Sequence, residues 1–85
     1  MNVCVVSTFE GTTEDYMNMF NSTKESAQGF MVDYELGVIR EGKVMLMMNI
    51  TDMNKMQEVM VSEEMKAWDE KFNCVDVIYA LDQMN

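Results

Sequence analysis

The spacing of hydrophobic residues changes several times along the chain, and these changes predict four strands separated by helical regions. β-Branched or alternating apolar residues, typical of β-strands, occupy residues 2–9, 32–40, 43–50 and 74–81. The dipeptide Glu41-Gly42 separates the second and third of these runs, which predicts a tight hairpin.

The first helical region follows Gly11, where Thr12 or Thr13 can cap a helix and Gly29 can end it. Its core-facing stripe has helical spacing and comprises Tyr16, Phe20, Thr23 and Ala27, with Met19 beside them.

The second helical region is predicted to break near Val61 into two short helices. Thr51-Asp52 caps the first piece and Ser62 caps the second. The second piece has an apolar stripe at spacings of three and four, formed by Met65, Trp68 and Phe72.

The order of elements is therefore β-α-β-β-α-β, which predicts a ferredoxin-like α+β fold. We expect a four-stranded antiparallel sheet of order 4-1-3-2 with both helical regions on one face. A chain of 85 residues forms one domain, so residues 1–85 are assigned to a single unit.

The strand at 43–50 is apolar on both sides, because Met45 and Met47 lie opposite the row that begins at Val44. One side packs under the helices. In a monomer the other side would leave roughly several hundred Å² of apolar surface in water, which is more than soluble monomers usually expose. The sequence therefore predicts a homodimer that pairs sheet against sheet, with Met45, Met47 and Ile78 as interface residues.

Fifteen acidic and six basic residues give a net charge of −9. This charge argues against nucleic acid and against an anionic membrane surface as partners, since both require clustered lysine and arginine. It favours solubility through self-repulsion, with an acidic decoy that binds a basic partner as the alternative. No signal peptide and no apolar run of membrane-spanning length is visible, so the expected location is the cytoplasm.

The chain has two cysteines and no histidine, which argues against a zinc site and against a cysteine–histidine catalytic pair. No metal or other cofactor is expected. In the predicted topology Cys4 and Cys74 lie at opposite ends of neighbouring strands, about 15–20 Å apart, which excludes a disulfide within one chain.

Pairs of acidic residues are the other candidate chemistry. Asp33 and Glu35 share one face of an edge strand, where charges discourage aggregation or could form an acid–base or cation site. Asp76 and Asp82 flank the last strand and are expected to lie too far apart to act together.

The arrangement of "VCVVSTFEG", "YELGVIREGKVMLMMNI", "TDMNKMQEVMVSEEMKAW" and "VDVIYAL" resembles the dimeric α+β barrel superfamily, which includes antibiotic-biosynthesis-monooxygenase-like proteins. The resemblance covers nearly the whole chain and implies a small, uncharacterised member. It also implies a cavity between sheet and helices, often lined by His, Asn, Trp or Arg. This chain has no histidine, so the haem ligand and the usual general base of such sites are missing.

The candidate ligand pocket combines Trp68 with Tyr34, Asn49, Tyr79 and Arg40. Trp68 could stack on a flat ligand, and Asn49 or Arg40 could polarise a carbonyl oxygen. The alternative is that Trp68 is a core residue, that Arg40 is a surface charge at the hairpin, and that Asn49 lies at a solvated strand end.

These observations favour an accessory or small-ligand-binding homodimer, with a second copy and a small apolar or aromatic molecule as partners. The alternatives are a cofactor-independent monooxygenase-like or isomerase-like enzyme and the acidic decoy. The enzyme requires a cavity of about 300 Å³ beside Trp68 with a convergent polar group. The twelve methionines suit either an adaptable apolar groove or a methionine-rich core and interface.

Overall fold

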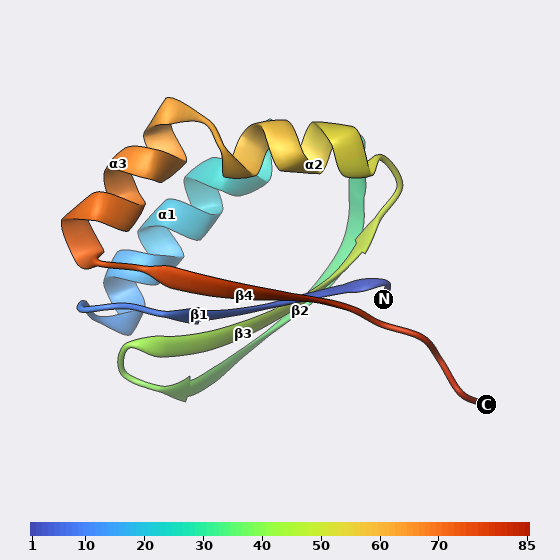
Figure 1. Cartoon of the computed structure of the whole chain (residues 1–85), viewed down its shortest axis with the longest axis horizontal. Coiled ribbons are helices and arrows are strands. Elements are labelled where there is room, and N and C mark those ends of the chain that lie inside the picture. The colour runs from blue at the N-terminus through green and yellow to red at the C-terminus, as the bar shows by residue number, and fades with distance from the viewer.

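A computed structural model describes all 85 residues and has the predicted β-α-β-β-α-β order, with the second helical region split in two (Figure 1). The elements are β1 (Val3–Thr8), α1 (Thr13–Ser26), β2 (Met31–Arg40), β3 (Lys43–Ile50), α2 (Met53–Met60), α3 (Glu63–Phe72) and β4 (Val75–Ala80). The predicted ferredoxin-like fold is confirmed.

The sheet has the order β2-β3-β1-β4, with every neighbouring pair antiparallel. This is the predicted order 4-1-3-2 read from the other edge. All three helices lie on one side of the sheet, and the other side is uncovered within the subunit (Figure 1). We call the uncovered side the open face.

Polar side chains begin each helix where the sequence predicted them. Thr12 forms a capping box with Asp15 before α1, Asp52 accepts from the Lys55 N–H before α2, and Ser62 accepts from the Met65 N–H before α3. Each bond satisfies an N–H that the first helical turn leaves free. None of the three helices combines the length and the hydropathy needed to cross a membrane.

The core lies between the sheet and the helices, and β3 contributes most to it. Alternate β3 residues are buried, with Val44 and Met48 less than 2% exposed. Opposite them, α1 contributes Tyr16 and Phe20, as its apolar stripe predicted. The rest of the buried cluster comprises Val3, Val5, Phe9, Ala27, Phe30, Leu46, Ile50 and Met56.

Strand pairing decides which side of β4 meets the helices. Val5 is in the core and pairs with both Leu46 and Ile78, so these three side chains share the helix-facing side. Met45 and Met47 lie on the open face, and Ile78 therefore does not share a face with them. The prediction grouped the three because the β4 sequence is apolar on both rows, and that pattern does not say which row faces the helices.

Asn2 joins the ends of two strands to the start of the chain. Its side-chain amide donates to the Ile50 carbonyl oxygen and accepts from the Ile50 N–H, both at 2.8 Å. Its backbone oxygen accepts from the Leu81 N–H at 3.0 Å, just after β4. The amide thus continues the β-ladder beyond the last backbone pair.

The hairpin at Gly42 is closely packed and gives a test of the fold. Gly42 has φ +83°, and a Cβ there would lie 2.7 Å from the Phe9 carbonyl oxygen. We expect Gly42→Ala to lower the free energy of unfolding in urea by about 1–3 kcal/mol more than Gly29→Ala does. Gly29 is the matched control, because its φ is +94° and a Cβ there meets no atom within 4 Å. Equal losses in the two variants would show that the hairpin absorbs the methyl group.

Candidate functional site: a cavity between sheet and helices

The candidate cavity lies between the helix-facing side of the sheet and the three helices. All seven elements contribute to its wall, and 14 of the 18 lining residues are hydrophobic. The space that the centre of a water molecule can occupy measures about 50 Å³. About 10–15 Å³ of such space holds one water, so the cavity has room for a few waters or one small organic group.

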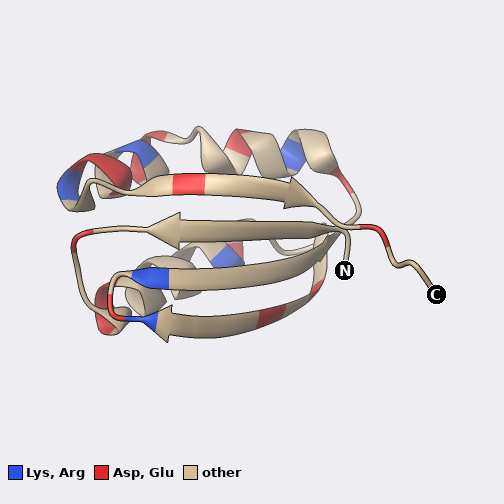
Figure 2. Ribbon diagram, turned by 60° about the horizontal axis from the view of Figure 1, so that its bottom comes forward, with Lys and Arg blue, Asp and Glu red and all other residues tan.

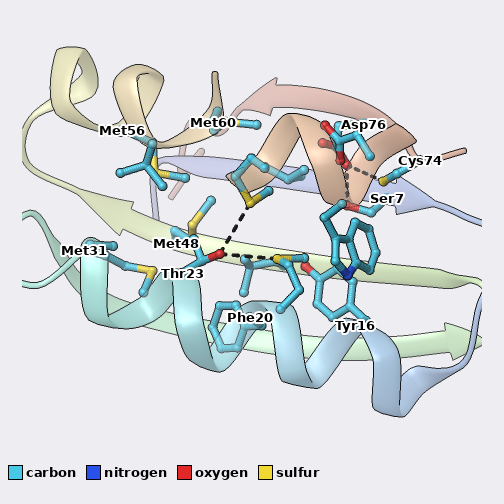
Figure 3. A pocket seen from close by; sticks show the side chains of 18 residues that line it. Ser7, Tyr16, Phe20, Thr23, Met31, Met48, Met56, Met60, Cys74 and Asp76 are labelled. Atoms are coloured by element: carbon cyan, nitrogen blue, oxygen red, sulfur yellow. Dashed lines mark hydrogen bonds between the residues drawn. The ribbon is translucent and has the colours of Figure 1, made fainter. Parts of the chain in front are cut away.

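Methionines dominate one end of the cavity. Figure 3 shows side chains of this group around the space, and the six that line it are Met19, Met31, Met48, Met56, Met60 and Met65. Thr23 adds a hydroxyl among them, 3.4 Å from the sulfur atoms of Met19 and Met65. Sulfur is a weak acceptor and the methionine side chain is flexible, so this end can adapt to a guest at modest cost.

The other end of the cavity is polar. Asp76 accepts a 2.6 Å hydrogen bond from the Ser7 hydroxyl and a 3.4 Å hydrogen bond from the Cys74 thiol (Figure 3). One ligand atom each from Asp69, Cys74 and Asp76 lies within 4.8 Å of the others. Ser7, Asp69, Cys74 and Asp76 are together called the carboxyl cluster below.

Backbone geometry brings the carboxyl cluster together. Asn73 ends α3 in the left-handed conformation, with φ 49°, and turns the chain back so that the Cys74 N–H donates to the Asp69 carbonyl oxygen at 2.9 Å. Asparagine tolerates this conformation better than most residues. On the neighbouring strand, Ser7 pairs directly with Asp76 across β1 and β4. A helix end and a strand pair therefore position the four side chains.

Burial and the nearby charge of Asp76 raise the pKa of three groups around the cavity. Loss of hydration, and then the nearby Asp76 carboxylate, raise the pKa of Asp69. The same two causes raise the pKa of the Cys74 thiol, and they raise the pKa of Tyr16 to about 12. The thiol and the phenol therefore stay protonated at neutral pH, so Cys74 is a poor nucleophile and acts as a hydrogen-bond donor.

The same atoms are an incomplete metal site. Asp69, Cys74 and Asp76 offer three ligand atoms, but the Cys74 thiol would have to lose its proton to bind zinc. Asp76 also already accepts hydrogen bonds from Ser7 and Cys74. This donor set fits a hydrogen-bonding role better than a tetrahedral cation.

Of the five residues predicted to form a ligand pocket, only Trp68 lines this cavity. Its ring lies 5.4 Å from Phe9, 4.7 Å from Phe72 and 6.2 Å from Tyr16, measured between ring centroids. Trp68 thus belongs both to an aromatic cluster and to the cavity wall, which combines the two interpretations given above.

The other four predicted pocket residues do not line this cavity. Tyr34 packs its ring edge-on against Phe20, outside the cavity. Asn49 lies on the open face because it is in the same row of β3 as Met47. Tyr79 lies there too, because it pairs with Cys4, which also pairs with Met47. Arg40 is exposed at the hairpin end of β2. An aromatic or polar residue on a strand can face either side, and only the register decides which.

The carboxyl cluster was missed at the level of sequence. The one available signal was that Ser7 and Asp76 are polar residues inside apolar strands. Asp76 was instead predicted only to flank the last strand, at a distance from Asp82. Asp69 follows Trp68 in the sequence and was not among the predicted site residues.

The comparisons with known proteins agree with this fold. SnoaB from Streptomyces nogalater, a cofactor-independent oxygenase, superimposes with a TM-score of 0.63 at 13% identity over 98% of this chain and 95% of that chain. An antibiotic biosynthesis monooxygenase gives 0.62 at 11% identity over 98% and 99%. A dimeric ferredoxin-like protein of unknown function from Thermobifida fusca gives 0.51 at 11% identity over 95% and 92%.

These similarities confirm the predicted resemblance at the level of the fold. No protein-family model matches the chain, and no curated protein matches it. The structural neighbours therefore define the architecture, a ferredoxin-like fold, and the activity of this chain has to be argued from its own residues.

The raised pKa of Asp69 predicts a pH-dependent stability. The folded state holds the Asp69 proton more tightly than the unfolded chain, in which the pKa of the group is 3.8. This contribution to stability is complete below pH 3.8 and is lost as the pH rises through the higher pKa of the folded state. We therefore expect Asp69→Asn to melt at a higher temperature than the wild type at pH 7, with the difference shrinking toward pH 3. Asp82→Asn, an exposed substitution with the same change of charge, is the control and should show no such trend. A lower melting temperature for Asp69→Asn at pH 7 would contradict the repulsion described here.

Proposed function

We propose that this protein is a small cytoplasmic homodimer that binds a small, mostly apolar molecule in the cavity between its sheet and helices. The observation that carries the proposal is a cavity with apolar walls and a polar cluster at one end. Small-molecule sites in proteins have this composition, with a few polar groups that orient the ligand. The two unpaired cysteines agree with a reducing compartment.

The size of the cavity limits the ligand. Pockets for drug-sized molecules occupy about 300–1,000 Å³, whereas this cavity, measured by the positions open to a water centre, has about 50 Å³. A short aliphatic chain or a single ring is therefore the expected guest, and anything larger requires the methionines to move.

The protein has a single tryptophan, so the emission of Trp68 reports directly on the cavity. We expect n-hexanol to change this emission saturably in the wild type. Val59→Phe should weaken the binding by about tenfold, because Val59 lines the cavity and the larger ring fills it. Val61→Phe is the matched control, since Val61 is 54% exposed and lies outside the cavity. Equal binding by all three proteins would place the alcohol elsewhere and contradict the proposed site.

The open face supports the homodimer. Its central strands contribute Val6, Met45 and Met47, and β4 adds Val77 and Tyr79, which are 46% and 51% exposed. The two central strands carry one charged residue, Lys43, and no acid (Figure 2). The acids of this face, Asp33 and Glu35, lie on the edge strand β2, so a second copy centred on β1 and β3 covers mainly apolar surface. A sheet-to-sheet contact there removes apolar area from water.

A charge placed on the open face tests the dimer. Met45 pairs across the sheet with Val6 and Gly37, so a carboxylate there meets no acid directly opposite in its own subunit. We expect the wild type to have twice the chain mass by light scattering, and Met45→Glu to be monomeric or aggregated. Met53→Glu, at an exposed position on α2, is the control and should stay dimeric. A monomeric wild type, or an unchanged Met45→Glu dimer, would contradict an interface on this face.

A second candidate function is cofactor-independent oxygenation or isomerisation of a small aromatic molecule. It is supported by the fold shared with SnoaB, which is a cofactor-independent oxygenase, and by a carboxyl group in the cavity, Asp69, that can accept a proton. The small cavity volume makes it the weaker candidate. This function predicts that the protein consumes oxygen when it is given a small hydroquinone, and that Asp69→Asn abolishes the oxygen uptake.

The acidic residues give no support to a decoy function. They are spread over the helices, the loops and the edge strands, and do not gather on one face of the molecule (Figure 2). The net charge of −9 is accounted for by solvated surfaces of several elements.

A further inference from the structure

One oxygen atom in the carboxyl cluster has no partner. Asp69 Oδ1 is buried and accepts no hydrogen bond, although Asp69 lines the cavity. The Ser7 hydroxyl and the Cys74 thiol both donate to Asp76. A buried acceptor without a donor is costly, so this atom is a vacant attachment point for a ligand that brings its own N–H or O–H.

The charge of the cluster restricts that donor further. Two carboxyl groups share one end of the cavity, and no lysine or arginine is among the lining residues. A cationic donor would offset the repulsion between Asp69 and Asp76, and its hydrogen bonds to carboxylates are stronger than those of a neutral hydroxyl. An anionic ligand would add to the repulsion.

The walls next to the cluster suit a cation with an apolar tail. Trp68 and Tyr16 lie edge to face, 6.2 Å apart, and both line the cavity beside the cluster. Aromatic faces attract organic cations. Beyond them the methionine end offers only apolar surface and the Thr23 hydroxyl. A hydrated metal ion would find only that one hydroxyl oxygen there.

We propose that the cavity binds a protonated primary amine with a short apolar chain, whose ammonium group donates to Asp69 and Asp76 while the chain lies among the methionines. This inference rests on the proposed binding of small apolar molecules and specifies their class. It assigns Asp69 as the residue that selects the amine over an alcohol or a carboxylate of equal length.

The test compares n-hexylamine, n-hexanol and hexanoate by titration of Trp68 emission at pH 7 with a chelator present. We expect hexylamine to bind at least about tenfold more tightly than hexanol, and hexanoate more weakly than either. Asp69→Asn should lower hexylamine affinity about tenfold and leave hexanol affinity within about twofold. Glu70→Gln, an exposed neighbour on the same helix with the same change of charge, should bind hexylamine as the wild type does.

The outcomes separate this inference from the function on which it rests. Equal binding of hexylamine and hexanol, or equal losses in Asp69→Asn and Glu70→Gln, would overturn the amine assignment and leave the apolar cavity as proposed. No binding of any of the three probes would overturn both. In a chelator-free buffer, Zn²⁺ that binds the wild type but not Asp69→Asn, together with no preference for hexylamine, would assign the cluster to a metal ion.

Discussion

The arrangement of the molecule depends on the register of β1 between its two neighbours. Val5 lies opposite Leu46 on one side and Ile78 on the other, and this pairing fixes the direction of every side chain in the inner strands. Because side chains alternate along a strand, a slip by one residue would turn Asp76 to the open face and Val77 toward the helices. The core, the open face and the carboxyl cluster are therefore three results of one pairing.

Local signals made most of the fold predictable from the sequence. Caps at Thr12, Asp52 and Ser62 mark helix starts because each satisfies a specific backbone N–H, and such chemistry is readable in one chain. The inward row of β3 was also readable, since Asn49 and Lys43 appear only in the other row. Both the caps and this alternation act within a few residues.

Non-local pairing explains what could not be predicted. The edge strand β4 carries Val77 and Tyr79 in one row and Ile78 and Ala80 in the other, so hydrophobicity does not orient it. Asp69 and Asp76 come from a helix and a strand, and their proximity depends on the turn at Asn73. The candidate site was therefore visible only through Trp68, whose large ring packs somewhere in the core under any register. The same uncertainty placed Ile78 in the predicted interface and Tyr79 in the predicted pocket.

Asn2 has a consequence for the way this fold can be connected to other polypeptides. Its backbone oxygen accepts from the Leu81 N–H while its side chain holds the end of β3, so the two extremities of the folded unit lie side by side. Adjacent extremities allow a domain to be inserted into a loop of another protein, or to be circularly permuted, with a short linker and little strain. The new termini of a permuted chain would best be placed in an exposed turn other than the one at Gly42, whose backbone is held against Phe9.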